Sequence, residues 1–222
     1  MAKNIADSGG VVVIGLGRFG KSLALELEAE GVEVLGIEQN TKIVQDLAGR
    51  LTHVVEADST DVEAMRQLSV GEFGRAVIAI GNNLEASVLT AFGLKSLGVP
   101  NIWAKATSES QGKILEQIGV GHVVRPEHDM GRRVAHLVRG KMLDYIEFDD
   151  GYAIVKTTPP HSILDRTLVD AAVRRRFGVT IVGIKRAGED FSYATPESVV
   201  HAGDLIIVSG ERDRVERFSN ED

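Results

Sequence analysis

Residues 11–20 read VVVIGLGRFG, four β-branched residues followed by three glycines in the pattern GxGxxG. An apolar strand, a glycine turn and a helical pattern in this order are typical of the first unit of a nucleotide-binding Rossmann-type sheet. Gly15 permits the tight turn, Gly17 lets a pyrophosphate approach the backbone, and Gly20 lets the helix pack closely on the strand. The helix N-terminus then faces the phosphates.

An acidic residue follows at the position that such a site needs. Glu38 lies 18 residues beyond Gly20, at the end of the second expected strand. Its carboxylate can accept hydrogen bonds from ribose hydroxyls and repels a 2′-phosphate, which disfavours NADP. NAD, ATP, ADP and AMP all offer a ribose and phosphates to this geometry, so the choice among them stays open. The alternative is a tight turn followed by a surface glutamate.

Short β-branched runs alternate with helical patterns from residue 10 to about residue 138. We expect strands at 11–14, 33–37, 53–55, 76–80, 101–105 and 122–124. Because crossovers between parallel strands are right-handed, this series predicts an α/β fold, a Rossmann-like doubly wound parallel sheet.

The pattern changes after Leu143 and becomes rich in strands. We expect strands at 152–155, 180–184 and 205–208, with a helix near 167–176 and a short terminal helix near 213–218. This predicts a small α+β domain. We therefore divide the chain into a nucleotide-binding domain at 1–140, a linker at 141–147 and a second domain at 148–222.

Composition excludes several classes of function. The net charge is −7 and no basic run is longer than the three arginines at 174–176, so we expect no nucleic acid partner. No apolar stretch approaches the ~18–20 residues of a membrane span and no signal peptide is recognisable, so we expect a cytoplasmic chain. The absence of cysteine excludes thiolate metal sites and thiol nucleophiles.

The sequence shows no pattern typical of catalysis. Its six histidines are scattered without metal-ligand spacing, and it contains neither a GxSxG elbow nor a Walker lysine motif. The second domain, about 75 residues, is too small to supply most of a dehydrogenase cleft. We therefore expect a binding protein rather than an enzyme.

Four segments together resemble the RCK (regulator of conductance of K⁺) proteins of the KtrA type, in the TrkA/KtrA family of potassium uptake regulators. They are VIGLGRFG at 13–20, ADSTD at 57–61, IGNNLEAS at 80–87 and PEHDMG at 126–131. Residues 163–210 are similar to the C-terminal lobe of the same family, so the resemblance covers nearly the whole chain.

The resemblance implies a cytosolic regulatory subunit of a bacterial potassium channel or transporter. Such subunits form dimers that build an octameric ring. The ring docks on a membrane potassium-translocating subunit of the KtrB or TrkH kind and changes shape as ATP replaces ADP. The protein would then lie at the inner face of the membrane through its partner. The alternatives are an NAD(H)-binding redox sensor with another partner and a stand-alone NAD-dependent enzyme.

The resemblance also implies roles for single residues. Arg18 would reach the nucleotide of the neighbouring subunit, Glu38 would hold the ribose, and Glu127 would help bind Mg²⁺ or Na⁺ near the phosphates. The residues alone leave an alternative for each. Arg18 can be a solvated residue at the start of a helix, and Glu127 can be an acid in the first helical turn after Pro126, where it complements the helix dipole.

Further candidates lie at the carboxyl ends of expected strands, where open α/β sheets bind ligands. Asp58 and Ser59 would flank the adenine, Asn82 and Asn83 would lie near the phosphates or cap the next helix, and Lys105 ends the fifth strand. The candidate nucleotide-binding residues are Gly15, Gly17, Arg18, Phe19, Gly20, Glu38, Asp58, Ser59, Asn82, Lys105 and Glu127.

A second ligand is implied for the C-terminal lobe. Residues 173–180 resemble the cyclic di-AMP site of several KtrA-like proteins, with Arg174 at the matching arginine position. Thr180 stands where some relatives carry asparagine, which is a departure from the pattern. The alternative reading of the arginines is an exposed helix end that complements its dipole.

Overall fold

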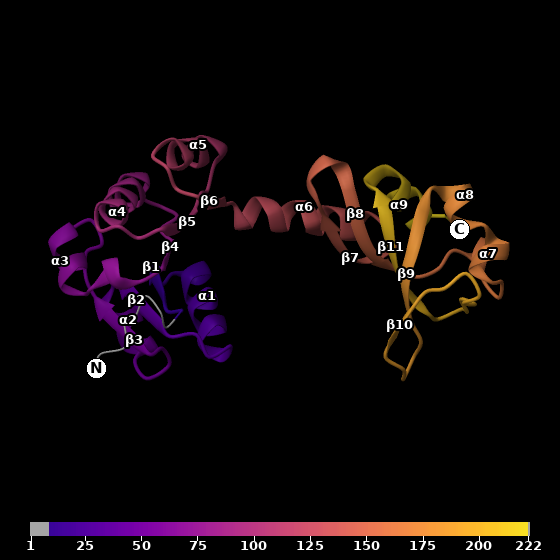
Figure 1. Cartoon of the computed structure of the whole chain (residues 1–222), viewed down its shortest axis with the longest axis horizontal. Helices are drawn as coiled ribbons and strands as arrows, with labels where there is room; N and C mark the ends of the chain where they lie inside the picture. The colour runs from indigo at the N-terminus through magenta and orange to yellow at the C-terminus, as the bar shows by residue number, and fades with distance from the viewer. Residues whose placement is uncertain (1–8, 222) are drawn as a thin grey trace. The chain divides into compact units, whose positions relative to one another are not determined.

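The computed structural model describes residues 9–221 (Figure 1). The chain divides into two compact units, an N-terminal unit that ends at His128 and a C-terminal unit that begins at Asp129. None of the helices within the described residues is long and apolar enough to cross a membrane.

The N-terminal unit contains a sheet of six parallel strands in the order β3-β2-β1-β4-β5-β6. The strands are β1 (Val11–Ile14), β2 (Val34–Glu38), β3 (His53–Glu56), β4 (Arg75–Ile78), β5 (Asn101–Lys105) and β6 (His122–Val124). This confirms the expected doubly wound sheet. The strand order reverses between β3 and β4, so β1 and β4 are neighbours at the switch point where such sheets bind ligands.

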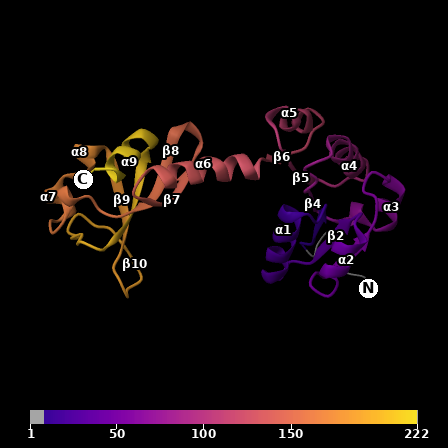
Figure 2. The ribbon, with the colours of Figure 1, turned by 180° about the vertical axis from the view of Figure 1, so that it is seen from behind.

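Helices cover both faces of this sheet, and Figures 1 and 2 show them from opposite sides. They are α1 (Arg18–Ala29), α2 (Thr41–Leu47), α3 (Val62–Gln67), α4 (Leu84–Ser96) and α5 (Glu109–Gln117), with a 3₁₀ turn at Val70–Glu72. Helix α6 (Pro126–Arg139) follows β6 and lies mostly in the C-terminal unit, where Leu137 packs against the core. Ala24 and Leu47 pack with Val11 and Val13 on one face, while the opposite face of β1 packs against α3, α4 and α5. Because successive residues of β1 point to opposite faces and both faces are covered, all four residues are buried and apolar.

Polar residues cap most of the helices that follow strands. Asn40, Asp61, Asn83 and Ser108 accept hydrogen bonds from backbone N–H groups of the first turns of α2, α3, α4 and α5. Helix α1 differs, because Gly17 stands at its N-cap and supplies no side-chain acceptor. The first N–H groups of α1 are therefore left for another acceptor.

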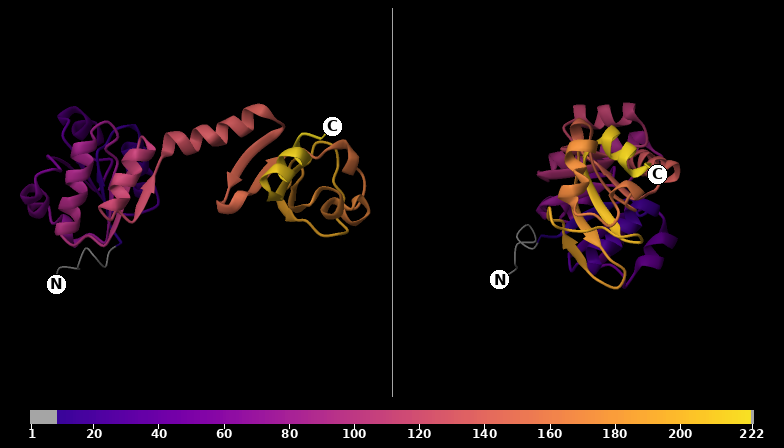
Figure 3. Two further views of the ribbon diagram at one scale, coloured as in Figure 1. Left: turned by 90° about the horizontal axis from the view of Figure 1, so that it is seen from above. Right: turned by 90° about the vertical axis from the view of Figure 1, so that its right-hand side faces the viewer.

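The C-terminal unit contains an antiparallel sheet in the order β10-β9-β11-β8-β7. Its strands are β7 (Met142–Glu147), β8 (Tyr152–Thr157), β9 (Val179–Lys185), β10 (Phe191–Tyr193) and β11 (Leu205–Glu211). Its helices are α7 (Leu168–Ala171), α8 (Val173–Phe177) and α9 (Arg212–Ser219), with 3₁₀ turns at Asp149–Gly151 and His161–Ile163. Helix α9, yellow in Figure 3, packs on the sheet and buries Val215 and Phe218. The expected α+β lobe is confirmed.

Three segments of the C-terminal unit differ from expectation, and one of them is β10, for which no strand was predicted. Residues 142–147, placed in the expected linker at 141–147, form strand β7, which pairs with β8. The register of this pairing shifts between Met142 and Asp144, so buried and exposed residues do not alternate regularly along β7. Regular alternation is the sequence signal by which a strand is predicted. The single helix expected near 167–176 is divided into α7 and α8, because Ala172 has a left-handed backbone with φ of 49°.

Candidate functional site

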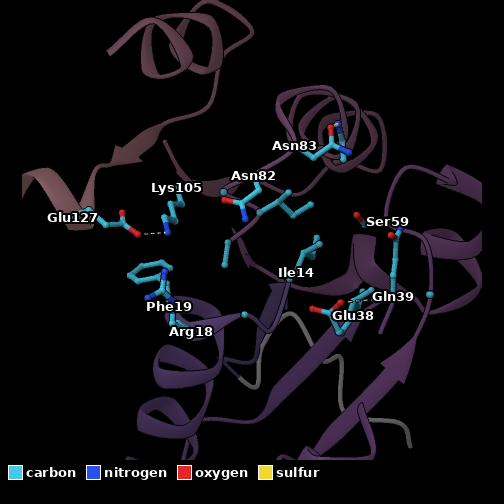
Figure 4. A pocket seen from close by; sticks show the side chains of 18 residues that line it. Ile14, Arg18, Phe19, Glu38, Gln39, Ser59, Asn82, Asn83, Lys105 and Glu127 are labelled. Atoms are coloured by element: carbon cyan, nitrogen blue, oxygen red, sulfur yellow. Dashed lines mark hydrogen bonds and ion pairs between the residues drawn. The ribbon is translucent and has the colours of Figure 1, made fainter. Parts of the chain in front are cut away.

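A cavity of about 320 Å³ lies at the carboxyl edge of the parallel sheet, around the switch point between β1 and β4 (Figure 4). The connections after β1, β2, β3 and β4, the last residue of β5 and the start of α6 all contribute to its wall. The predicted candidates that line it are Gly15, Gly17, Arg18, Phe19, Glu38, Ser59, Asn82, Lys105 and Glu127. Residues spread over more than a hundred positions of sequence are thus brought to one place.

The three glycines of the turn have different surroundings. Gly15 has φ of +84°, a conformation that favours glycine. A Cβ on Gly20 would lie 1.9 Å from the carbonyl oxygen of Gly15, so Gly20 is required for packing and does not line the cavity. A Cβ on Gly17 would meet no atom within 4 Å. The space beside Gly17 therefore opens into the cavity.

Next to Gly17, the N-terminus of α1 faces the cavity without a side-chain cap and without an acidic residue in its first turn. N–H groups at the start of a helix lack intrahelical partners, and together with the helix dipole they favour an anion. Arg18 is the first residue of the helix and is exposed. This end of the cavity fits phosphate groups.

The carboxylate of Glu38 connects the end of β2 to the glycine turn. Its Oε2 accepts a hydrogen bond of 2.7 Å from the N–H of Leu16, and its Oε1 accepts bonds of 2.9 and 3.0 Å from the N–H groups of Gln39 and Asn40. An ionised carboxylate has about four acceptor positions. These bonds hold the group at the cavity and leave acceptor capacity for ribose hydroxyls.

Lys105 and Glu127 form an ion pair at the same end of the cavity as Arg18 and Phe19, opposite to Glu38 (Figure 4). The distance between Lys105 Nζ and Glu127 Oε1 is 2.5 Å, and Lys105 is only 9% exposed. The ammonium group also lies 5.7 Å from the centre of the Phe19 ring. The hydrogen bond from Lys105 lowers the pKa of the Glu127 carboxyl. Within residues 9–221 no group of three histidine or acidic side chains is arranged to hold a metal ion.

Asp58 and Ser59, expected to flank an adenine, take different positions. Asp58 does not line the cavity, and its Oδ1 accepts hydrogen bonds from the N–H and the hydroxyl of Thr60 at 2.9 and 2.8 Å. The bond from the Thr60 N–H is the main cause of the lowered pKa of the Asp58 carboxyl. Ser59 lines the cavity, but its hydroxyl is buried and bonded to that of Thr90 at 2.8 Å.

The two asparagines that follow β4, Asn82 and Asn83, have different roles. Asn83 Oδ1 accepts a hydrogen bond of 3.0 Å from the N–H of Ala86, which confirms the helix-cap alternative, and the residue also lines the cavity. No such cap is formed by Asn82, which lines the cavity beside Gly81. Gln39 lines the cavity next to Glu38 but was not among the residues expected from the sequence. Its only signal in the sequence is its place directly after the acidic residue.

Arg174 lies in the C-terminal unit, so it is not part of this cavity. It lines a second cavity of about 640 Å³, formed by α7, α8, the beginning of β9 and residues 194–196. Thr180 lies in the same wall, and the aliphatic Val169 in it is 61% exposed.

Residues 11–126 match the TrkA-N domain family and residues 152–221 match the TrkA-C domain family. The chain is 38% identical to Ktr system potassium uptake protein C of Bacillus subtilis (strain 168), over 93% of this chain and 94% of that protein. It is 37% identical to Ktr system potassium uptake protein A of the same organism, over 94% and 95%. The chain belongs to the KtrA-type RCK family.

The structure of this KtrA-type RCK protein is also similar to that of the GsuK channel. The structure of that channel bound to NAD has a TM-score of 0.67 and 18% identity, covering 96% of this chain and 40% of the channel. The structure of GsuK bound to ADP has a TM-score of 0.51 and 19% identity, covering 56% and 33%. At this level of identity the comparison shows the fold alone.

Proposed function

We propose that this KtrA-type protein is a cytosolic regulatory subunit that gates a membrane potassium-transport system according to the adenine nucleotide in its N-terminal unit. The main support for nucleotide binding is the cavity at the carboxyl edge of the parallel sheet. Its wall contains both the Glu38 carboxylate, which suits a ribose, and the uncapped start of α1, which suits phosphates. Two relatives named potassium uptake proteins, similar over nearly the full chain, support the transport role.

The charges at the phosphate end favour ATP and ADP as the pair of ligands. Arg18 and Lys105 both line this end. ATP differs from ADP by one anionic phosphate, to which such cationic groups can donate hydrogen bonds. Arg18 is exposed, and in this proposal it contacts a phosphate held by a neighbouring copy. A ligand shifts a conformational equilibrium only through different affinities for the two states. A γ-phosphate supplies such a difference.

We place an Mg²⁺ or Na⁺ ion near Glu127 in this proposal. The exposed carboxylate of Glu127 is at present paired with Lys105, and phosphate oxygens can compete for that ammonium group. Because no cluster of three ligating side chains surrounds Glu127 among the described residues, the remaining ligands would be phosphate oxygens, water or a second copy.

We further propose a homo-oligomer, with a dimer as its unit and an octameric ring as its assembly, docked on a membrane potassium-translocating subunit of the KtrB or TrkH kind. The protein acts on this partner by binding and shape change and catalyses no reaction. The second candidate function, an NAD(H)-binding redox sensor, is favoured by the GsuK structure bound to NAD.

Cyclic di-AMP is a second proposed ligand, in the cavity lined by Arg174. That cavity combines the guanidinium with apolar side chains from α7 and from Pro196, a combination suited to phosphates and bases. Calorimetric titration should show binding that Arg174→Ala abolishes. Unchanged binding in this variant would contradict the assignment.

The gating function is tested by potassium uptake in the native host. Deletion of the gene should slow uptake at limiting external potassium, and a plasmid copy should restore it. A copy carrying Glu38→Ala should restore it poorly, because the ribose contact is lost, while its abundance stays normal on immunoblots. Uptake that is unaffected by the deletion would contradict the proposal.

A further inference from the structure

On the side of the parallel sheet where α1 lies, the helical cover stops short of β5 and β6. The apolar cluster under α1 and α2 includes Val77 of β4 but, among the described residues, no side chain of β5 or β6. Trp103 of β5 pairs in register with Val77, so it faces the same side, and it is 39% exposed. Its neighbours Ile102 and Ala104 point to the opposite face and are buried. Because parallel sheets are normally covered on both faces, an exposed tryptophan in the middle of β5 indicates a missing cover.

Trp103 and His122 form a flat aromatic surface on this side of the sheet. Their rings stack with centroids 4.0 Å apart and planes inclined by 17°. Helix α1 borders this surface, because Phe19 lies beside Lys105 at the end of β5. Glu28, nine residues and therefore half a turn away from Phe19, binds backbone N–H groups at the start of β2 and just before β3. The residues at helical spacing on the Phe19 side are Leu23, Glu26 and Glu30. We call Trp103 and His122 together with this border the open face.

A second surface without a partner lies on α6. Met130, Val134 and Val138 are spaced by four residues, so they form one stripe, and they are 53%, 44% and 79% exposed. A different side of α6 contacts the C-terminal unit, where Leu137 packs against the core and His136 stacks on the tyrosine ring of β7. None of the fourteen residues of α6 is buried. An amphipathic helix normally turns such a stripe toward a core, so an exposed stripe indicates a partner surface.

The two surfaces are flanked by charges of opposite sign. The border of the open face carries the carboxylates of Glu26 and Glu30, and the last turn of α6 carries the guanidinium of Arg139. All three side chains are exposed, and within residues 9–221 none of them forms an ion pair. Complementary charges at the edge of an interface fix its register. They favour an arrangement in which the end of α6 lies beside the end of α1.

We propose that the α6 stripe of one copy packs on the open face of a second copy, and that the second copy returns the same contact. Two-fold symmetry makes such a contact occur twice. The stripe then covers Trp103 and His122, and Arg139 lies near Glu26 and Glu30. The inference rests on the self-association in the proposed function and names its contact surface. It requires neither a bound nucleotide nor the membrane partner.

Trp103 is the only tryptophan of the chain, so its fluorescence reports on the open face directly. The variant Val138→Glu is suited to the test, because a side chain that is 79% exposed is not needed for the fold. It should move the emission to longer wavelength and speed quenching by acrylamide. Sedimentation should show self-association weakened at least about 10-fold, since an unpaired charge is buried in each contact. Val138→Ser should shift the emission less and in the same direction.

The matched control is Val182→Glu, the same change at a valine of β9 that is 40% exposed. It lies outside both surfaces, so emission, quenching and sedimentation should stay as in wild type. Circular dichroism and thermal melting check the fold of each variant. An emission of Trp103 that Val138→Glu leaves unchanged would overturn the inference.

A hybrid of two differently tagged copies shows whether the contact is made by a second copy. One copy carries Val138→Glu and keeps Trp103, and the other carries Trp103→Phe and keeps the stripe. In the hybrid, the intact stripe of the second copy should cover Trp103 and return its emission to the wild-type position. No return would mean that the stripe covers the open face of its own chain, which would overturn the inference and leave the nucleotide switch standing. A wild type that sediments as a monomer would overturn both the inference and the proposed homo-oligomer.

Discussion

At the scale of single residues, two glycines of the same turn should respond differently to the same change. Gly20→Ala places a Cβ 1.9 Å from a backbone oxygen and should destabilise the protein by about 2–3 kcal/mol. Gly17→Ala meets no atom within 4 Å, so it should cost at most about 1 kcal/mol, because alanine is a poorer N-cap than glycine, while weakening nucleotide binding. Denaturant unfolding and calorimetry measure the two effects. A destabilised Gly17→Ala variant with normal binding would contradict this division of roles.

Asp204 should make the C-terminal unit sensitive to acid. Burial alone would raise the pKa of this carboxyl, which is 2% exposed, but hydrogen bonds from Arg186 and from the N–H of His201 lower the pKa below its usual value. A lowered folded-state pKa contributes stability above the unfolded pKa of about 3.9, and this contribution is lost as the pH falls through the folded-state pKa. The Tm should therefore fall below about pH 4. Asp204→Asn should be less stable at pH 7 and should lose less on acidification, and equal acid losses in both proteins would refute the assignment.

Glu38 could be found from the sequence because a single acid at a strand end, at a fixed distance from the glycine turn, has few alternative explanations. The different positions of Asp58 and Gln39 relative to the cavity could not be found in this way. Both are polar residues that follow expected strands. In the structure Asp58 is bonded to Thr60 and does not line the cavity, whereas Gln39 does.

At the scale of elements, the start of α4 offers a matched pair of adjacent asparagines. Asn83→Ala removes the cap of this helix and should destabilise the N-terminal unit by about 1 kcal/mol. Asn82→Ala removes a side chain of the cavity wall that caps no helix, so it should leave stability nearly unchanged. Thermal melting in the absence of ligand distinguishes them. Equal losses would mean that the cap is not the source of the stability.

Elements with strong local signals were the predictable ones. The six parallel strands are apolar runs bounded by turns, and each was expected within a residue or two of its place. Strand β7 was missed because its pairing shifts between Met142 and Asp144, and β10 was missed because its three residues are all exposed. The break at Ala172 has no local signal, since alanine is the strongest helix former and its left-handed backbone is imposed by tertiary structure.

At the scale of the whole molecule, the two units have separate hydrophobic cores. Leu115 lies in a core of the N-terminal unit, and Phe218 lies in that of the C-terminal unit. Both side chains are at most 1% exposed, so Leu115→Ala should cost about 2–5 kcal/mol and Phe218→Ala about 3–5 kcal/mol. Scanning calorimetry should show that Leu115→Ala lowers the transition that ATP raises and Phe218→Ala lowers the other. A single transition that both variants and ATP shift alike would contradict independent cores.

In the proposed function, the N-terminal unit distinguishes adenine nucleotides by their phosphates. Calorimetric titration of wild type and Arg18→Ala with ATP, ADP and NADH, with and without magnesium, tests this claim most directly. We predict that ATP and ADP bind more tightly than NADH, and that Arg18→Ala weakens ATP selectively because one cation at the phosphate end is lost. Tighter binding of NADH, or equal losses for ATP and ADP in the variant, would contradict the claim and favour the redox sensor.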